Sequence, residues 1–330
     1  MAGGLGTRMK SATPKHLHPI LGRRIVDWVV DAARGAGVER LVVVASPDSA
    51  GSFDGVEVAV QQQPLGTGDA VRSAREALAG ASGDVLVLNG DVPGLTPQLV
   101  DDLVETHRRE NAAATVLAFE PPDARAYGRI VRDGDGRLAR IVEAADASPD
   151  ELALTEVNSG IYVFRAEKLW PALDRLEAHN AQGELYVTDT LGLLTGDGDP
   201  VSVHTAPVAW EVEGINTRAE LADVAARLRD RINEAHMLAG VTIVDPATTW
   251  IETDVEIEPD VTIQPFSHLR GNVRIATGAE IGPFAYVRPG TEVGENAKVG
   301  TFVEIKKSRI GARTKVPAFE SASRTVPGRR

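Results

Sequence analysis

The chain has 330 residues, of which 43% are hydrophobic and 25% are charged, and its formal net charge is −12 at pH 7. That balance is typical of globular proteins, and the length predicts about two domains. The acidic charge argues against general nucleic-acid binding, which requires a basic surface that matches phosphates. The absence of cysteine excludes disulfides, thiolate nucleophiles and cysteine-ligated zinc. The longest apolar runs have about five residues, and a membrane span requires roughly 20.

Residues 1–218 alternate strand-like and helix-like segments. Short apolar runs predict buried strands at 41–45, 56–60, 84–88 and 114–119, and amphipathic stretches predict helices at 25–36, 67–78 and 96–109. This alternation predicts an α/β domain with a largely parallel sheet. Ligands of such sheets bind at the carboxyl ends of the strands.

A long helix is predicted to follow this domain. Residues 217–236 place apolar side chains every three or four positions, with charged residues between them. Thr217 stands before this pattern and Glu220 follows three residues later, which is typical of an N-terminal capping box. We place this linker helix at residues 219–239.

Residues 240–317 carry the strongest internal pattern. An aliphatic side chain recurs at every sixth position, at Ile251, Ile257, Ile263, Leu269, Ile275, Ile281, Val287, Val293, Val299 and Ile305. A hexapeptide period predicts a parallel β-helix, in which every sixth side chain points into a narrow three-sided prism. Solenoids of this type expose flat, partly apolar sides, so we expect a homotrimer through this region. Residues 318–330 lose the period and predict an irregular tail.

The N-terminal segment Gly3-Gly-Leu-Gly-Thr-Arg-Met9, followed by Pro14-Lys15, combines glycines with fixed positive charge. Glycines let backbone N–H groups approach a phosphate closely, and Arg8 and Lys15 suit a triphosphate. The segment is not a Walker A loop, because no Gly-Lys-Ser/Thr follows. It is not a Rossmann fingerprint, because no strand precedes it in this sequence.

Two further segments favour nucleotide and metal binding. Gln61-Gln-Gln-Pro-Leu-Gly-Thr-Gly68 opens a helix near Thr67, where backbone donors and glutamine amides suit a base edge or an anion. Asn89-Gly90-Asp91 closes an apolar strand, and a carboxylate at that end can hold a divalent metal against phosphates. Taken alone, Asp91 is equally consistent with a turn residue or a helix cap.

Further motifs follow in order: Tyr127-Gly-Arg, Ile141-Val-Glu143, Glu156-Val-Asn-Ser-Gly160, Gln182-Gly-Glu-Leu-Tyr-Val-Thr-Asp189 and Glu211-Val-Glu-Gly-Ile-Asn216. Together with the segments above, they resemble the bifunctional N-acetylglucosamine-1-phosphate uridyltransferase/glucosamine-1-phosphate acetyltransferase family over residues 1 to about 317. The resemblance implies a Rossmann-like nucleotidyltransferase domain, a linker helix and a shortened left-handed β-helix.

The same resemblance implies an activity and a setting. The reaction is Mg²⁺-dependent uridylyl transfer from UTP to N-acetylglucosamine-1-phosphate, which supplies UDP-N-acetylglucosamine for cell-wall precursors. We expect a cytoplasmic protein that binds neither nucleic acid nor membrane.

Roles for individual residues also follow from the resemblance. It implies that the uracil and ribose are held by Met1, Ala2, Gly3, Gly4, Gln61, Gly66 and Thr67. It implies catalytic roles for Arg8 and Lys15, which neutralise the triphosphate. The remaining implied contacts are Asn89 and Gly90 for the nucleotide, Asp91 and Asn216 for nucleotide and Mg²⁺, and Gly128, Glu143 and Asn158 for the sugar.

Two departures from the family pattern change these expectations. The family places a strand before the glycine-rich loop, whereas this sequence starts inside that motif at Met1. Two neighbouring strands then lack backbone partners, so we expect either a natural start further upstream or a chain that folds poorly. In the C-terminal region, Arg288 and Lys306 match positions that contact the sugar phosphate, but Ala318 stands where the family has its general-base histidine. The coils that bind acetyl-CoA are missing, so we expect no acetyl transfer.

Three interpretations stay open from the sequence. The first is the uridyltransferase, and the second is a nucleotidyltransferase for another sugar phosphate, such as glucose-1-phosphate with UTP or dTTP. The third is a non-catalytic remnant that trimerises or binds nucleotide. Retention of five functional residue types favours an enzyme: Arg8, Lys15, Asp91, Asn158 and Asn216.

Overall fold

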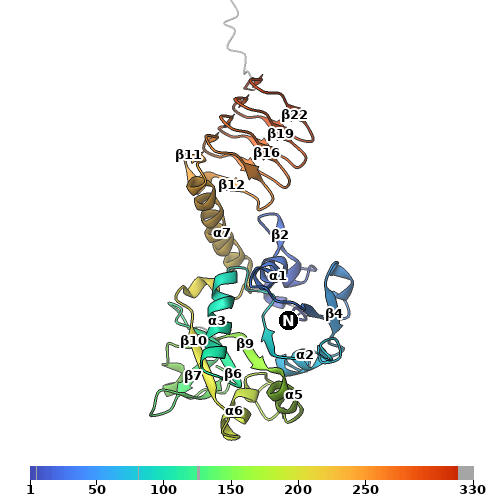
Figure 1. Ribbon diagram of the computed structural model, residues 1–330, viewed down its shortest axis with the longest axis vertical. Coiled ribbons are helices and arrows are strands. Elements are labelled where there is room, and N and C mark those ends of the chain that lie inside the picture. The colour runs from blue at the N-terminus through green and yellow to red at the C-terminus, as the bar shows by residue number, and fades with distance from the viewer. Residues whose placement is uncertain (5, 81, 125–126, 319–330) are drawn as a thin grey trace, which may run out of the picture. The chain divides into compact units, whose positions relative to one another are not determined.

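The computed structural model describes residues 1–4, 6–80, 82–124 and 127–318. The chain divides into two compact units (Figure 1). The first comprises Met1–His18 and Arg24–Leu221, and the second comprises Pro19–Arg23 and Ala222–Arg330. Among the described residues, no helix combines the length and the apolar character that crossing a bilayer requires.

Helices and strands of the first unit alternate as the sequence predicts. Its α-helices are α1 (Ile25–Gly35), α2 (Thr67–Ser73), α3 (Pro97–Arg109), α4 (Pro149–Leu152), α5 (Ala166–Asp174) and α6 (Asp189–Gly196). Its longer strands are β3 (Val42–Ala45), β4 (Glu57–Val60), β5 (Asp84–Val87), β6 (Ala114–Phe119), β7 (Arg129–Arg132), β8 (Leu138–Val142), β9 (Val157–Arg165) and β10 (Val201–Thr205). Short 3₁₀ helices are η1 (Thr7–Met9), η2 (Lys15–Leu17), η3 (Ala50–Ser52) and η4 (Ala209–Glu211), and β1 (Pro19–Ile20) pairs with β2 (Arg23–Arg24).

The main sheet of this unit has six strands. Its order is β10-β6-β9-β7-β8, and β5 also pairs with β9. β6 and β10 run parallel, but β9 runs antiparallel to both β5 and β6. The prediction of a largely parallel sheet was therefore wrong here. The chain reaches β9 through the β7–β8 hairpin and the four-residue α4, and not through the long crossover helix that a parallel neighbour requires.

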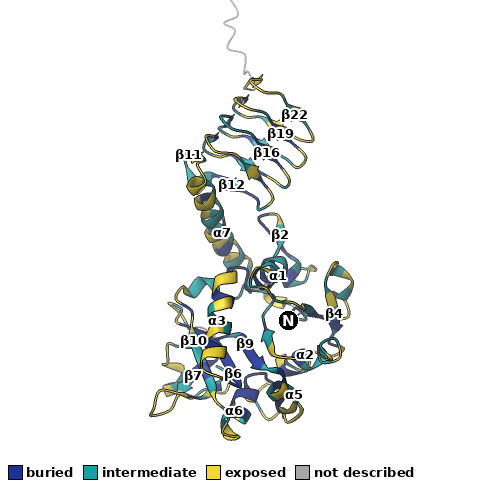
Figure 2. Ribbon diagram, in the orientation of Figure 1, coloured by how far each residue is buried: buried dark blue, intermediate teal, exposed yellow. Residues whose placement is uncertain are grey.

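Helices cover both faces of the main sheet. On β9, Tyr162 and Phe164 pack in one core with residues of α2, α5 and α6, whereas Ile161 and Val163 pack in another with residues of α1 and α3. Successive side chains of a strand point to opposite faces, so this alternation separates the two cores. Figure 2 shows β6 and β9 as buried strands of this unit. The arrangement confirms the predicted α/β fold.

β3 and β4 form a separate parallel pair. Between β3 and β5, the described chain contributes only its first two residues. The Ala2 N–H donates to the Val44 carbonyl at 2.7 Å, and the Gly90 N–H donates to the Met1 carbonyl at 2.8 Å. Within the described residues, no other strand pairs with these facing edges of β3 and β5.

The second unit contains α7 (Arg218–Leu238), which begins in the first unit, η5 (Pro246–Thr248) and a three-sided parallel β-helix (Figure 1). Its strands are β11 (Thr242–Ile243), β12 (Trp250–Ile251), β13 (Glu256–Ile257), β14 (Thr262–Ile263), β15 (His268–Leu269), β16 (Arg274–Ile275), β17 (Glu280–Ile281), β18 (Tyr286–Val287), β19 (Glu292–Val293), β20 (Lys298–Val299), β21 (Glu304–Ile305), β22 (Arg309–Ile310) and β23 (Lys315–Val316). These strands form three parallel sheets, and each sheet contains every third strand in chain order.

The hexapeptide aliphatics form the core of this β-helix. Ile263 pairs with Ile281, and Ile281 pairs with Val299, so equivalent residues stack 18 positions apart. Nearly all of the predicted positions are buried in one apolar cluster. The structure confirms the three short sides per coil that the period predicts.

An exposed aromatic ladder follows one corner of the β-helix. Phe266, Phe284 and Phe302 stack with ring centroids 4.8 Å apart, and each is at least 43% exposed. Their spacing of 18 residues places one ring on each successive coil. Among the described residues of the β-helix, the exposed large hydrophobic side chains are these three and Val244.

Candidate functional site

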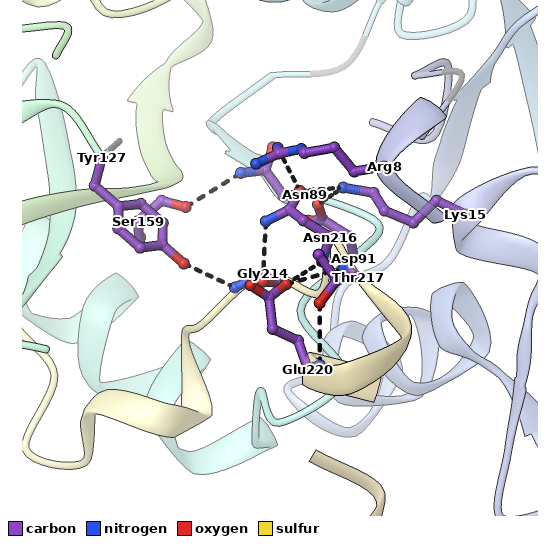
Figure 3. Close-up of polar contacts among 10 residues, drawn as sticks. All are labelled: Arg8, Lys15, Asn89, Asp91, Tyr127, Ser159, Gly214, Asn216, Thr217 and Glu220. Carbon is purple, nitrogen blue, oxygen red and sulfur yellow. Dashed lines mark hydrogen bonds and ion pairs between the residues drawn. The ribbon is translucent and has the colours of Figure 1, made fainter. Parts of the chain in front are cut away.

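Four polar side chains from distant parts of the first unit meet in one cluster (Figure 3). The Lys15 ammonium forms an ion pair with Asp91 and donates to the Asn216 amide oxygen at 3.0 Å. Arg8 donates to the same oxygen at 2.8 Å. Lys15 and Asp91 are 15% and 21% exposed, so the cluster is accessible to a ligand. Arg8 and Lys15 lie on η1 and η2, and Asp91 follows β5.

A glycine brings the basic loop against Lys15. Gly6 has φ +60°, and a Cβ atom there would lie 2.4 Å from the Lys15 Cβ. Only glycine permits both this left-handed conformation and this close approach. The loop therefore contributes to the site partly by setting the position of Lys15.

The start of α7 holds Asn216. The Glu220 carboxylate accepts the N–H groups of Thr217, at 3.1 Å, and of Asn216, at 2.6 Å. The Glu220 N–H donates to the Thr217 hydroxyl at 3.2 Å, which confirms the predicted capping box. The sequence analysis missed the bond to Asn216, although an asparagine directly before a capping box is a signal for it.

Further backbone contacts fix this part of the site (Figure 3). The Gly214 N–H donates to the Tyr127 hydroxyl at 3.2 Å, and the Ile215 N–H donates to the Asp91 carbonyl at 2.9 Å. The Asn89 amide donates to the Ser159 carbonyl at 3.1 Å. Tyr127 belongs to a recognised motif, but nothing in the sequence indicates its contact with a residue 87 positions away.

Asp91 and Asn216 are suitable ligands for a divalent metal. Their side-chain oxygens converge on one cation, the Lys15 ammonium. Mg²⁺ prefers such hard oxygen ligands, together with water and substrate phosphates. Within the described ranges, no group of three or more histidine, aspartate or glutamate side chains is placed to hold a metal. The protein thus supplies two metal ligands, and the remaining ligands of a bound Mg²⁺ would come from substrate phosphates and water.

A second group surrounds the start of α2. The Gln61 amide donates to the Gly66 carbonyl and to Asp69, at 3.0 Å each. Gly66 has φ +116°, and a Cβ there would lie 2.5 Å from the Leu185 carbonyl oxygen. The Thr67 hydroxyl accepts an N–H at 3.0 Å from the segment after Leu185. The Gln61 amide nitrogen is therefore engaged within the protein.

The N-terminal residues lie beside this group. A Cβ on Gly3 would lie 3.2 Å from the Gln61 side-chain oxygen, whereas no atom lies within 4 Å of one on Gly4. Met1 and Ala2 lie between strands, and a Cβ on Gly90 would lie 2.9 Å from the Met1 carbonyl oxygen. Gly90 thus permits the close approach of the N-terminal segment to the end of β5.

A third group brings together the three residues that the resemblance assigns to the sugar. The Asn158 N–H donates to the Gly128 carbonyl at 2.8 Å, and a Cβ on Gly128 would lie 3.3 Å from a Glu143 carboxylate oxygen. Thr188 donates to Glu143 at 3.3 Å. Burial raises the pKa of Glu143, which the Thr188 hydroxyl opposes. The Asn158 amide donates to the Tyr162 hydroxyl at 2.7 Å.

The residues assigned to acetyl transfer lie on the β-helix surface. Arg288 pairs with Glu304 at 2.7 Å. Lys306 and Ala318 are exposed. Most of the predicted irregular tail, residues 319–330, lies outside the described part of the chain.

Two family descriptions match the chain. Residues 1–189 match the MobA-like NTP transferase domain, and residues 254–289 match the bacterial transferase hexapeptide (six repeats). The first match covers more than half of the chain. Both agree with the architecture described above.

Curated relatives extend these matches across both units. The proteins named "Bifunctional protein GlmU" of Kineococcus radiotolerans, Leifsonia xyli and Lactobacillus helveticus are 48%, 46% and 41% identical to this chain. Each alignment covers 84% of the chain, and 58%, 59% and 61% of the respective relative. The chain therefore spans about three fifths of the length of these relatives. The similarity confirms the resemblance that the sequence motifs indicate.

Proposed function

Since the chain belongs to the MobA-like NTP transferase family, we propose that it catalyses Mg²⁺-dependent uridylyl transfer from UTP to N-acetylglucosamine-1-phosphate. The products are UDP-N-acetylglucosamine, a cell-wall precursor, and pyrophosphate. The observation that supports this reaction best is the convergence of Arg8, Lys15, Asp91 and Asn216 in one accessible cluster.

The reaction requires alignment and charge neutralisation more than covalent help. A phosphate oxygen of the sugar phosphate attacks the α-phosphorus of UTP, and the bond from that phosphorus to the bridging oxygen of pyrophosphate breaks. The attacking phosphate is already anionic, so no general base is required. Arg8 and Lys15 supply positive charge where the departing pyrophosphate gains negative charge.

We assign Mg²⁺ to the oxygens of Asp91 and Asn216. A bound Mg²⁺ would neutralise phosphate charge at these two oxygens, and Lys15 would then be available to the triphosphate. The present ion pair supports this assignment, because it shows that both oxygens can serve one cation. Glu220 acts as a positioning residue that fixes the backbone of Asn216.

For the sugar we propose contacts with Gly128, Glu143 and Asn158. The buried Glu143 carboxylate is an acceptor for sugar hydroxyl or amide groups, and the Asn158 amide can both donate and accept. For the uracil and ribose we propose the segment 1–4 together with Gln61, Gly66 and Thr67. The bonds from Gln61 to this helix start support a role in shaping the pocket.

The test measures pyrophosphate release with UTP, Mg²⁺ and N-acetylglucosamine-1-phosphate. We expect turnover from the 330-residue chain, and a loss of at least ~100-fold in kcat/KM for Asp91→Ala. The matched control is Asp101→Ala, an exposed carboxylate on α3, which we expect to keep full activity. Equal rates for Asp91→Ala and Asp101→Ala would remove the metal assignment.

Two further arms of the assay separate the other interpretations. Faster turnover with glucose-1-phosphate, using UTP or dTTP, would identify a different sugar substrate. Binding of UTP without turnover on any of these sugars would identify a non-catalytic nucleotide-binding protein. Circular dichroism of each variant distinguishes lost chemistry from a lost fold.

We propose that the chain does not acetylate glucosamine-1-phosphate. Ala318 has no side chain that can accept a proton from the sugar amine. CoA release from acetyl-CoA in the presence of glucosamine-1-phosphate measures this activity directly, and release above the background rate would contradict the proposal.

For assembly we propose a homotrimer through the β-helix. The exposed phenylalanine ladder supports it, because an apolar stripe repeated on successive coils suits burial against another copy. Light scattering after size-exclusion chromatography gives the mass that decides the oligomeric state.

A further inference from the structure

Gln61 lies at the carboxyl end of a parallel pair of strands. It directly follows β4, and its backbone N–H donates to the carbonyl of Ala45, the last residue of β3, at 2.9 Å. Ligands of parallel strands bind at this end. Gln61 is 8% exposed, so the contacts of its side-chain amide decide which of its two polar atoms is left for a ligand.

The amide nitrogen of Gln61 is held by two hydrogen-bond acceptors. It donates to the Gly66 carbonyl and to one carboxylate oxygen of Asp69, each at 3.0 Å. A carbonyl and an ionised carboxylate can only accept, and a reversed amide would place its own oxygen against both of them. The two bonds therefore fix the orientation of the Gln61 side chain.

Both acceptors are themselves held in place. The other carboxylate oxygen of Asp69 accepts from the Arg72 guanidinium at 2.8 Å, and the Asp69 side chain is 14% exposed. Gly66 lies so close to Leu185 that a Cβ on it would be 2.5 Å from the Leu185 carbonyl oxygen. Arg72 and Leu185 thus stabilise the two groups that orient Gln61.

The accepting end of the Gln61 amide faces the N-terminal segment. Its oxygen is the atom nearest to a Cβ placed on Gly3, at 3.2 Å. No N–H or O–H group of the described residues donates to this oxygen. The protein therefore offers a hydrogen-bond acceptor, and not a donor, to a ligand that lies against Gln61.

We infer that Asp69 is a positioning residue that sets the nucleobase choice of this site, an inference that rests on the proposed binding of the base at Gln61. Uracil and thymine carry a donor at N3, whereas cytosine has nearly the same size but carries an acceptor there. With Gln61 held by Asp69, cytosine would place two acceptors against each other, and neither would have a partner. The site therefore selects a nucleotide whose base has an N3–H group, and it rejects a cytosine nucleotide.

The test compares binding of UTP, CTP and N3-methyl-UTP to the 330-residue chain with Mg²⁺ by isothermal titration calorimetry. We expect UTP to bind at least ~100-fold more tightly than CTP. N3-methyl-UTP keeps both carbonyl oxygens of uracil but lacks the N3–H group, so we expect it to bind at least ~100-fold more weakly than UTP.

Asp69→Asn tests the positioning role. Asparagine has the shape of aspartate, but its NH₂ group can donate to the Gln61 oxygen when that amide is reversed. The reversed amide offers a donor to N3 of cytosine, so we expect the ratio of UTP affinity to CTP affinity to fall about tenfold. A merely structural role of Asp69 would weaken the binding of both nucleotides alike and leave this ratio unchanged.

Asp174→Asn is the matched control. Asp174 also pairs with an arginine of the segment around α2, Arg75, at 2.9 Å. We expect this variant to keep the affinity ratio of the unmodified chain. A partly unfolded sample of either variant lowers the number of binding sites and not the ratio of the two affinities.

The outcomes separate this inference from the proposed function. Equal affinities of the unmodified chain for UTP and CTP would overturn the base selection, and an unchanged ratio in Asp69→Asn would overturn the role of Asp69. Binding of neither nucleotide by a chain that circular dichroism shows to be folded would overturn the proposed function, and this inference with it. The readout is binding, so it does not depend on whether the protein transfers uridylyl groups.

Discussion

The requirement for glycine at individual positions of this protein follows from the atoms that lie next to each glycine. The sequence analysis interpreted the glycine-rich loop through its possible approach to phosphate, but Gly6 approaches Lys15 and Gly66 approaches the backbone of Leu185. A motif shows where glycine is required, and only the fold shows which neighbour requires it. The same limit applies to Tyr127, whose hydroxyl contacts Gly214 across the unit. No local pattern encodes that contact.

Gly66→Ala tests whether the close contact with Leu185 or the backbone conformation of Gly66 contributes more to the requirement for glycine at this position. We expect a loss of about 3 kcal/mol in the free energy of unfolding of the first unit, because φ is +116° and the Cβ would contact backbone atoms of Leu185. The matched control is Gly183→Ala, which has φ +65° but open space around it. We expect Gly183→Ala to lose about 1 kcal/mol in the free energy of unfolding. Urea unfolding measures both, and equal losses would show that the contact with Leu185 is not limiting.

His16 makes the stability of the first unit depend on pH. Its pKa is lowered to about 4, chiefly by burial and also by the positive charges of Met1 and Lys15, whereas Asp91 acts to raise the pKa. In the folded state the His16 imidazole therefore stays neutral over a pH range, below about pH 6.5, in which the unfolded state binds a proton at this residue. Stability is fully present above that pH and falls as the pH drops toward 4, by about 3 kcal/mol.

Urea unfolding between pH 7.5 and pH 4 measures this dependence. We expect His16→Gln to lose less stability than the unmodified chain over this range. His179 has a side chain that is 84% exposed, so His179→Gln should keep the original dependence. An unaltered dependence in His16→Gln would assign it to other groups.

Among the elements, the first turn of α7 contains both a helix-capping motif and a contact that holds a residue of the candidate site. Thr217 and Glu220 form the capping box that the sequence predicts, and the same carboxylate holds the backbone of Asn216. Sequence reasoning placed this helix end correctly because capping is a local interaction with fixed spacing. It could not place β9, because the direction of that strand depends on how the β7–β8 hairpin returns the chain to the sheet.

Glu220→Ala tests the positioning role under the proposed reaction. We expect kcat/KM for pyrophosphate release to fall about tenfold, because Asn216 loses its backbone anchor, while stability falls by about 1 kcal/mol. Glu220→Gln keeps an oxygen acceptor and should restore most of the activity. Glu234→Ala, on an exposed position of the same helix, is the control. If Glu220→Gln and Glu220→Ala lost equal activity, the anchor would not explain the effect.

At the scale of the whole molecule, the chain has separate hydrophobic cores for its two units. The sequence predicted both folds. The β-helix repeats an aliphatic residue at every sixth position, and the α/β unit alternates segments with strand-like and helix-like hydrophobic patterns. The sequence did not predict how the sheet of the first unit is divided between β3–β4 and the strands around β9. That division depends on long-range pairing.

Separate cores predict two unfolding transitions. We expect calorimetry to show two transitions, and UTP with Mg²⁺ to raise the temperature of only one of them. At a UTP concentration 100 times the Kd, the shift corresponds to about 2.7 kcal/mol. A single transition that shifts as a whole would show that the two units unfold together.

The stacking of equivalent residues 18 positions apart has a consequence for how the β-helix can change in length. The segment from Ile305 to Ile310 is one residue short of the six-residue period, yet Val293 still pairs with Ile310 and Val299 with Val316, each 17 positions apart. A single residue can therefore be lost at a corner without breaking the stacking of aliphatic residues on the coils. Each coil adds about 4.8 Å to the height of the prism, so homologues with different numbers of coils should differ in height by multiples of this step.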